Sequence, residues 1–354
     1  MRRLFYGGVF AALIVLLALS ILLGLVVGPI YIPPTKIAEI VLSQVATPIA
    51  HVFGARLPIR IDNESTSYII VTQIREPRTL AAAIGGAALA IAGLLFQILF
   101  RNPIVGPYVL GVSSGAALMV GAAILMGVTL GIGPLYSPHT IVVMAFIGAL
   151  IVSSLMLSAA AVVRSPVTLL VMGLMVGYLC SSVTTIMITL AQKQQVKAFI
   201  MWSFGSFAGY EWSDVVISYE VLVPTIVAAL ALARPLNLML LGEDYASTMG
   251  LDVRKLRLAV IGVSSALTAT VTAFAGPVGF IGVAVPHLAR IVTRTSDSAI
   301  LIPATALLGG IVTVLCDVAS RILIPSIALP ISAVTSLFGA PLIIALLLRR
   351  RARL

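Results

Sequence analysis

The sequence predicts an all-helical integral membrane protein with about ten transmembrane helices. Of its 354 residues, 60% are hydrophobic and only 10% are charged, whereas soluble domains carry about 25% charged residues. A soluble globule of this composition would have too little polar surface to cover its core. A spanning helix takes about 20 residues, so the length allows roughly ten spans with their connections. We therefore expect one transmembrane domain that covers residues 1–354.

The spans follow from the apolar stretches, and each must be helical because a lipid-exposed backbone has to satisfy its own hydrogen bonds. The first apolar run, Val9 to Val27, is long for a signal peptide and no small-residue cleavage site closes it, so we interpret it as a retained span. The second span carries small residues such as Gly85 and Gly93, which allow helices to approach closely. The predicted spans are 8–28, 79–99, 108–127, 140–162, 168–190, 213–233, 256–274, 278–293, 301–320 and 334–348.

The basic residues predict the orientation of these spans. With a cytoplasmic N-terminus, both tails and the even-to-odd connections carry 14 of the 22 Lys and Arg residues. Cytoplasmic loops of membrane proteins concentrate such residues, so this model is self-consistent and places both termini in the cytoplasm of a cell (inner) membrane. The eight basic residues left outside are Lys36, Arg56, Arg60, Arg75, Arg78, Lys193, Lys197 and Arg321.

Two segments outside the spans fall on the outer face in this model. The longer one, about 29–77, contains an apolar piece that resembles a helix and a polar patch from Asp62 to Ser67. The shorter one, Val196 to Tyr210, mixes aromatic residues with glycines, which suits a short helix at the membrane interface. We expect Trp202, Phe204, Gly205 and Ser206 in it to line the outer gate of a pathway.

Several function classes are disfavoured by the composition. The net charge of +10 fits basic cytoplasmic loops better than nucleic-acid binding. The two cysteines lie in separate apolar runs and the three histidines are not paired, so neither a disulfide nor a metal site is predicted. A membrane enzyme would need catalytic polar groups facing one cavity, and the sequence suggests none.

The source of energy also follows from the charges. Ion-coupled carriers keep charged relays inside their spans, whereas here charges lie almost entirely at span ends. Asp317 is the main exception, and Arg321 at i+4 favours a local ion pair. The chain lacks a phosphate loop of the GxxxxGK[ST] type, so ATP would be hydrolysed by a separate subunit. The segment of about 237–252, with acidic Glu243 and Asp244 and a closing Gly250, is equally consistent with a docking helix and a plain connector.

Four stretches resemble the iron-chelate and cobalamin permease family of type II ABC importers. They are Arg75 to Ala90 with Arg101-Asn-Pro103, Leu110 to Ala116, Leu241 to Gly250, and Ala275 to Arg290 followed by Leu337 to Pro341. The resemblance runs from about residue 72 to the C-terminus. It implies a ten-span subunit that pairs with a second copy, two ATP-binding cassette subunits that hold ATP and magnesium, and an external substrate-binding protein. The chain itself would then bind no cofactor and would not be an enzyme.

The resemblance also implies functional positions. Binding-protein docking falls on Arg75, Arg78 and Arg321. ATPase coupling falls on the segment with Leu241, Gly242, Glu243, Asp244, Ala246 and Gly250, which raises the docking-helix interpretation above the connector. The cytoplasmic gate falls on Ser165, Pro166 and Val167, where some family members have small polar residues. Two departures from the family are Glu76 between the paired arginines and an insertion of about 46–70.

The sequence thus predicts a permease that imports a metal chelate such as an iron–siderophore complex, haem or cobalamin. An oxyanion such as molybdate is the alternative cargo, because cargo choice rests largely with the binding protein. An ion-coupled secondary transporter is the alternative of a different class.

Overall fold

The computed structural model describes residues 2–52, 65–128, 137–163, 165–324 and 329–351, and this part of the chain contains helices and no strand. Seven helices are long and apolar enough to cross a membrane, and three shorter apolar helices join them, at Val112–Met126, Ile281–Thr293 and Ile331–Pro341. The prediction of about ten spans is therefore confirmed. Residues 53–64 of the predicted insertion of about 46–70 lie outside the described residues.

The ten apolar helices match the predicted spans in order and closely in position. They are α1 (Arg2–Val26), α4 (Glu76–Leu99), α5 (Val112–Met126), α6 (Pro138–Val162), α7 (Pro166–Leu190), α9 (Trp212–Ala231), α12 (Val253–Ala275), α13 (Ile281–Thr293), α14 (Ser298–Ile322) and α15 (Ile331–Arg351). The other helices are α2 (Pro34–Val52), α8 (Lys193–Ser203), α10 (Ala233–Leu240) and α11 (Glu243–Thr248). α3 (Thr66–Ile69) and the π-helical η1 (Ile70–Arg75) directly precede α4.

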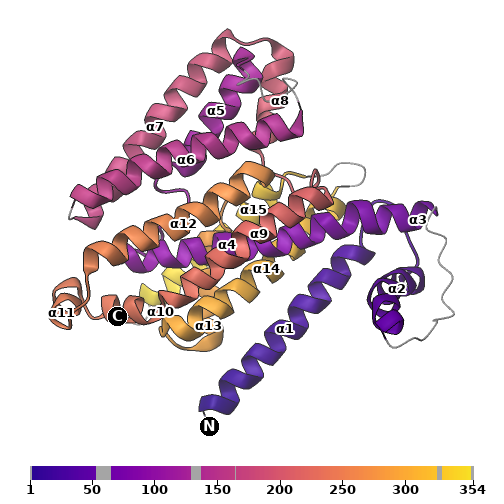
Figure 1. The fold of residues 1–354 in the computed structure, drawn as a ribbon, viewed down its shortest axis with the longest axis horizontal. Helices are drawn as coiled ribbons and strands as arrows, with labels where there is room; N and C mark the ends of the chain where they lie inside the picture. The colour runs from indigo at the N-terminus through magenta and orange to yellow at the C-terminus, as the bar shows by residue number, and fades with distance from the viewer. Residues whose placement is uncertain (1, 53–64, 129–136, 164, 325–328, 352–354) are drawn as a thin grey trace.

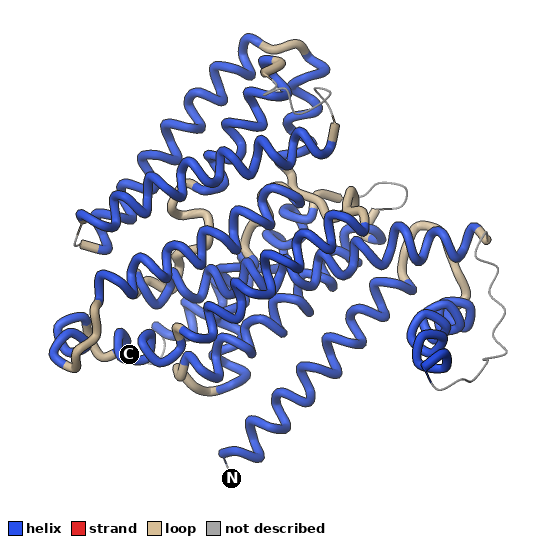
Figure 2. Tube along the Cα trace, in the orientation of Figure 1, coloured by secondary structure: helices blue, strands red, loops and turns tan. Residues whose placement is uncertain are grey.

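The spans form two groups (Figure 1). α4 lies at the centre of the larger group and packs against α14, α12, α13 and α9, with α1 on the outer side of α14. The smaller group, α5 to α8, lies beside it and is joined to it chiefly through the contact of α6 with α12. Figure 2 shows that the connections gather at the two ends of the long helices. We call these ends the α2 end and the α11 end, after the short helix that lies at each.

Small residues explain how tightly the central helices pack. A methyl group at Gly93 of α4 would lie 1.8 Å from the carbonyl oxygen of Gly282 in α13. Likewise, a methyl group at Gly86 would lie 2.4 Å from the carbonyl oxygen of Gly309 in α14. Backbones can approach so closely only where both helices present small residues. The glycines of the second predicted span therefore fix the crossing points of α4 with its neighbours.

Two boundaries differ from the sequence prediction. α3, η1 and α4 form one continuous helical stretch from Thr66 to Leu99, so helix begins thirteen residues before the expected span at 79. Pro77 follows closely after the π-helical η1, where the backbone departs from the regular i→i−4 hydrogen-bond pattern, so the helix continues across the proline. α5 begins only at Val112, after Gly111 with φ of +78°, and not at 108.

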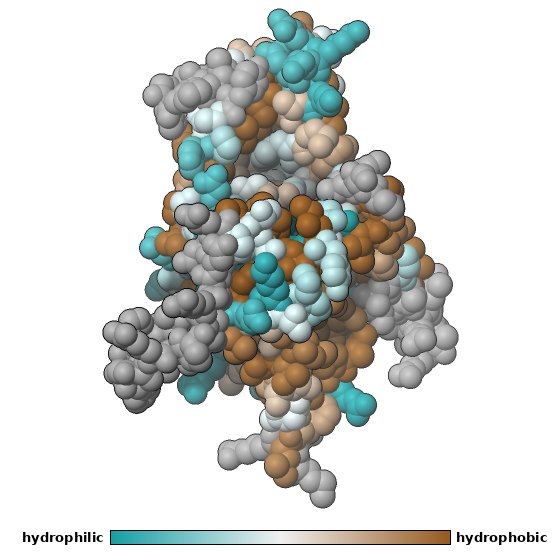
Figure 3. All heavy atoms as spheres, turned by 90° about the vertical axis from the view of Figure 1, so that its right-hand side faces the viewer, coloured by the Kyte–Doolittle hydropathy of each residue, from teal (hydrophilic) through white to brown (hydrophobic). Residues whose placement is uncertain are grey.

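The outer surface of the bundle is apolar, as a lipid-facing surface must be. In each of α1, α7 and α9, only 22% of the most apolar 18-residue stretch is buried, whereas 89% of that stretch is buried in the helix that contains α4. In Figure 3, which looks at the α2 end, hydrophilic residues gather near the centre and at the top of the face, with apolar residues on its flanks. The molecule is therefore a multi-pass membrane protein.

Candidate functional site

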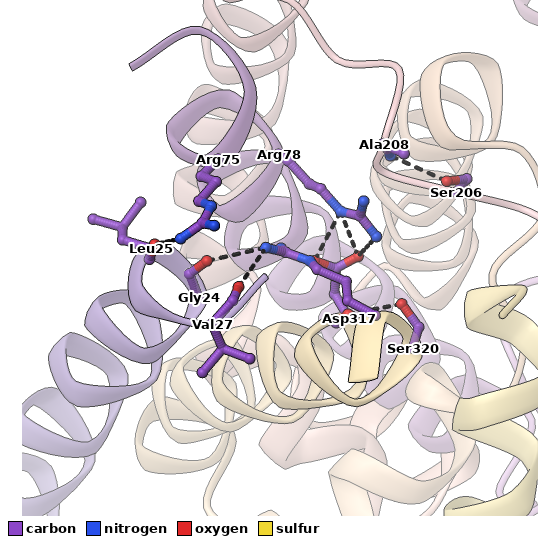
Figure 4. A network of polar contacts seen from close by, with 10 residues as sticks. Gly24, Leu25, Val27, Arg75, Arg78, Ser206, Ala208, Asp317 and Ser320 are labelled. Atoms are coloured by element: carbon purple, nitrogen blue, oxygen red, sulfur yellow. Dashed lines mark hydrogen bonds and ion pairs between the residues drawn. The ribbon is translucent and has the colours of Figure 1, made fainter. Parts of the chain in front are cut away.

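Two of the predicted docking residues, Arg75 and Arg78, lie close together at the α2 end (Figure 4). The third, Arg321, joins them there through hydrogen bonds to Asp317 and to the end of α1. Arg75 is 3% exposed. Its guanidinium donates to the carbonyl oxygens of Leu25 at 2.7 Å and Val26 at 2.9 Å, and also to that of Ile30. These carbonyls lie at and after the C-terminal end of α1, where unpaired acceptors carry the negative end of the helix dipole. Arg75 therefore fastens the end of α1 to the α4 helix.

Asp317 of α14 joins the other two arginines. Its carboxylate accepts from Arg78 Nε at 3.0 and 3.1 Å and from Arg78 Nη2 at 2.9 Å. It also accepts from Arg321 Nε at 3.1 Å and from Arg321 Nη2. The predicted Asp317–Arg321 pair is thus present, while the contribution of Arg78, 239 residues away, was not expected. One buried carboxylate serves two guanidiniums, so the cluster keeps an excess of positive charge.

The arginines differ in how accessible they are. Arg321 is 8% exposed, and its Nη1 donates to Gly24 O at 3.0 Å and Val27 O at 3.4 Å. The Arg78 side chain keeps 13% of its surface exposed. Arg78 is therefore the member of the predicted trio with the most surface left for an external partner. Arg75 and Arg321 are covered by the end of α1.

Glu76, which lies between Arg75 and Arg78 in the sequence and departs from the family pattern, contacts α2. Glu76 is 7% exposed, and its carboxylate accepts from Gln44 Nε2 of α2 at 3.1 Å. Among the described residues, Glu76 makes no ion pair with Arg75 or Arg78. It therefore links the outer helix α2 to the top of α4 and does not neutralise the adjacent arginines.

The predicted outer-gate residues pack against the loop between α12 and α13. A methyl group at Gly205 would lie 2.5 Å from Pro277 O, and Ser206 N donates to Ala275 O at 2.7 Å. Trp202 is half-buried and Phe204 is 42% exposed. Pro277 O also accepts from Ser332 of α15 at 2.7 Å. This segment is therefore tied to both α12 and α15.

The predicted coupling segment forms two short helices at the α11 end. α10 ends before Gly242, whose φ of +127° is open only to glycine, and α11 follows. Ala246 is fully buried, whereas Leu241, Tyr245 and Met249 are 64%, 62% and 59% exposed. Asp244 and Gly250 are also exposed. The segment thus presents apolar side chains to the outside although it does not span.

Polar contacts hold α11 against the spans. Glu243 pairs with Arg257 of α12 at 3.4 Å, and Arg257 also donates to Val163 O at the end of α6 at 2.9 Å. Arg101, after α4, donates to Met239 O of α10 at 3.2 Å. A displacement of α11 would therefore act directly on α12 and α6. The sequence did not indicate these contacts, because they join different helices and leave no local pattern.

Asp252 marks the end of the coupling segment. Its carboxylate accepts the backbone N–H of Lys255 at 3.0 Å and so caps α12. That hydrogen bond, followed by the one from the Lys255 side chain, holds the pKa of Asp252 below its ordinary value. The cap stays charged at neutral pH and fixes the start of α12.

The predicted gate residues lie at the start of α7, at the same end. Ser165 is the N-cap and its hydroxyl accepts from Thr168 N at 3.3 Å, while Pro166 occupies the first turn. Val167 is 67% exposed. These residues belong to the smaller group of helices. No group of three or more His, Cys, Asp or Glu residues in the described ranges is placed to hold a metal ion.

Comparison with known proteins places these features in a family. The FecCD transport family model matches residues 16–349. The hemin transport system permease protein HmuU of Yersinia pestis is 36% identical over 279 residues, which cover 78% of this chain and 83% of that protein. The vitamin B12 import system permease protein BtuC of Escherichia coli O9:H4 (strain HS) is 35% identical over 283 residues, which cover 80% of this chain and 85% of that protein.

A solved structure has the same fold. It is described as an inward-facing conformation of a metal-chelate type ABC transporter, and it matches with a TM-score of 0.78 and 26% identity over 97% of this chain and 99% of that chain. The family model covers the α4, α11 and α14 regions that carry the arginine cluster and the predicted coupling segment. This chain therefore belongs to the FecCD transport family, whose members are permease subunits of ABC transporters and not themselves enzymes.

Proposed function

We propose that this chain is the permease subunit of a binding-protein-dependent ABC importer that moves a metal chelate into the cytoplasm. The observation that carries the proposal is the family match over residues 16–349, together with a ten-helix arrangement like that of a metal-chelate transporter. The hemin and vitamin B12 relatives favour a chelate over an oxyanion. ATP and magnesium would be held by two partner ATPase subunits, and this chain would hold no cofactor.

Reconstituted vesicles test this function. We expect vesicles that contain the permease and its ATPase to accumulate haem, cobalamin or an iron–siderophore complex. Accumulation should require ATP on the side of the membrane that carries the ATPase and binding protein on the opposite side. Permease without ATPase is the control and should not transport. Accumulation driven by a proton or sodium gradient without the ATPase would instead support the ion-coupled carrier.

The α11 end is the cytoplasmic end in this proposal, with both termini in the cytoplasm of the cell membrane. The excess of basic residues in the connections at that end supports this orientation. Ser247 of α11 and Lys193 of α8 are both exposed, at opposite ends. In intact cells or sealed spheroplasts, a membrane-impermeant thiol reagent should label Lys193→Cys but not Ser247→Cys. Labelling of Ser247→Cys before lysis would reverse the assignment.

A second copy of the chain would complete the pathway. α7 carries exposed apolar residues along much of its length, among them Val171, Met175 and Leu179. It contacts only its own small group of helices closely, so it is free to face another copy or lipid. The gate residues Ser165 to Val167 begin this helix, and an apolar constriction there can close by excluding water. Light scattering of the purified chain in detergent should give the mass of two copies, and a monomer would reject this arrangement.

The external binding protein would dock at the α2 end. Arg75, Arg78 and Arg321 bring an excess of positive charge there, which suits carboxylates on a partner. Arg78 would make the direct contact, since Arg75 and Arg321 are covered by the end of α1. Arg75 and Arg321 would hold Arg78 and α1 in place.

Replacing Arg78 with glutamine should weaken binding of the cognate binding protein about tenfold, the equivalent of about 1.4 kcal/mol. Asp317 would keep Arg321 as its partner, so the fold should survive. Surface plasmon resonance with the immobilised permease complex measures the affinity. Lys36→Gln removes an exposed charge at the same end and serves as the control. If both variants bind the binding protein with the same affinity as the parent, Arg78 does not contribute to docking.

A further inference from the structure

A cavity at the α11 end lies outside the docking, coupling and gate residues. It has a volume of about 470 Å³ and opens between the first turns of α1 and the loop that joins α13 to α14. In Figure 1 the start of α1 lies away from the other helices, near that loop. The cavity is lined by Phe5, Tyr6, Thr293, Arg294, Thr295 and Ser296.

Arg294 places an uncompensated positive charge at this cavity. It is exposed and ends α13 with φ of +51°, a left-handed conformation that residues with a side chain seldom adopt. Its guanidinium carbon lies 6.0 Å from the centre of the Phe5 ring, a cation–π distance. Within the described part of the chain, Arg294 has no carboxylate partner. The loop thus holds a cation over an aromatic ring without neutralising it.

Hydrogen-bond donors lie beside this cation. Among the described residues, the hydroxyl and the backbone N–H of Ser296 have no hydrogen-bond partner. Thr295 Oγ1 accepts from Asp297 N at 3.1 Å, which leaves the Thr295 hydroxyl proton free to donate. The nearest acid in the loop, Asp297, directs its Oδ1 to Asn237 Nδ2 at 2.7 Å and Ala299 N at 3.0 Å. It forms no ion pair with Arg294 among the described residues. A guanidinium with neighbouring hydroxyl donors suits a phosphate group.

The depth of the cavity identifies the source of that phosphate. Phe5 and Tyr6 lie at the start of the apolar stretch Leu4–Val26, so they lie where the hydrocarbon region ends and headgroups begin. Beyond the cavity, α1 exposes an apolar side that includes Val15 at 57% and Leu19 at 55%. Acyl chains can lie along this side while the headgroup enters the cavity. A soluble phosphate has no acyl chains, so this apolar side of α1 would not add to its affinity.

We infer that this cavity binds the phosphate of an anionic phospholipid headgroup, with Arg294 as the main charged contact and Phe5 and Ser296 beside it. Basic pockets between spanning helices are known to suit such headgroups. The bound lipid would bridge α1 and the loop between α13 and α14, which meet here through the contact of Phe5 with Arg294. This inference does not depend on which face of the membrane the α11 end occupies.

Native mass spectrometry of the full-length permease with defined lipids tests the inference. The protein would be purified in detergent and mixed with phosphatidylglycerol, with phosphatidylcholine, or with inorganic phosphate alone. We expect the parent chain to retain phosphatidylglycerol at least fivefold more than phosphatidylcholine. Arg294→Asn should reduce that retention about fivefold to the phosphatidylcholine level, and asparagine tolerates the left-handed backbone. Phe5→Leu should give an intermediate loss.

Two further variants separate the lipid site from folding and from general charge. Arg294→Gly frees the strained backbone and removes the cation, so it should fold at least as well as the parent and still lose phosphatidylglycerol. Arg254→Gln removes an exposed arginine at the same end, in the first turn of α12, and should leave retention unchanged. Equal retention of phosphatidylglycerol by the parent, Arg294→Asn and Arg294→Gly would overturn the proposal. Binding of inorganic phosphate without any lipid preference would overturn the assignment to a lipid.

Discussion

Asp317→Asn is expected to destabilise the protein by about 3–5 kcal/mol, because it leaves the buried Arg321 and the half-buried Arg78 without their shared counter-ion. The Asp317 side chain is 1% exposed and accepts from both Arg78 and Arg321. Asparagine keeps the shape but turns one carboxylate oxygen into an N–H₂ group that faces positive charge. The thermal midpoint should fall by on the order of 10 °C.

Thermal unfolding in detergent with a thiol-reactive dye measures this effect. Cys180 and Cys316 are buried and free, so each becomes reactive only when the bundle opens. Asp244→Asn is the matched control, since Asp244 is exposed and should change stability by less than about 0.5 kcal/mol. A midpoint for Asp317→Asn as high as that of the control would contradict the role of Asp317 as a buried counter-ion.

A double-mutant cycle can assign the effect to the ion pairs. Arg78→Leu removes one guanidinium from the cluster. If Asp317 acts through Arg78, combining Arg78→Leu with Asp317→Asn should cost less than the sum of the single changes. Additive losses would mean that Asp317 stabilises α14 by another route. In that case the accessible Arg78 would not depend on Asp317 for its position.

The spanning helices could be predicted from the sequence because one physical quantity, apolar content over about 20 residues, determines them. Gly93 and Gly86 were visible as small residues, but which helices they would touch was not. The continuous helix from Thr66 through η1 into α4 was missed. Its Glu76-Pro77 sequence suggests a break, and only the structure shows that the proline follows a π-helical segment across which the helix continues.

The arginine cluster could be predicted only in part, for a similar reason. The Asp317–Arg321 pair follows from i, i+4 spacing on one helix. Arg78 joins from α4, and the carbonyls that bind Arg75 come from the end of α1. Neither contact leaves a local pattern, since backbone carbonyls carry no sequence signature. For the same reason the burial of Arg75 and Arg321, which concentrates any docking on Arg78, required the structure.

The coupling segment could be located but not resolved into its parts. The acidic residues and glycines between 237 and 252 indicated a short helix. The structure divides it at Gly242 into α10 and α11 and places α11 against Arg257. It also separates the buried Ala246 from the exposed Leu241, Tyr245 and Met249. Exposed apolar side chains on a segment that does not span are the expected feature of a docking surface.

Tyr245→Ala is expected to weaken association with the ATPase subunit about thirtyfold, the equivalent of about 2 kcal/mol, because an exposed aromatic residue is a typical interface hot spot. This expectation rests on the proposed partnership of the α11 end with the ATPase. Tyr245 is 62% exposed, so its removal should leave the permease fold intact and its unfolding midpoint unchanged. Uptake in reconstituted vesicles should fall in parallel with ATPase binding.

Ser247→Ala in the same helix provides the comparison, since Ser247 is also exposed but offers little apolar area to a partner. It should bind the ATPase within about twofold of the parent, a difference of about 0.4 kcal/mol. If Tyr245→Ala binds equally well but transports less, the side chain transmits motion without contributing to affinity. If it changes neither binding nor uptake, the partner must contact a different part of the α11 end. The Glu243–Arg257 pair would then lose its proposed role in passing movement from α11 to α12.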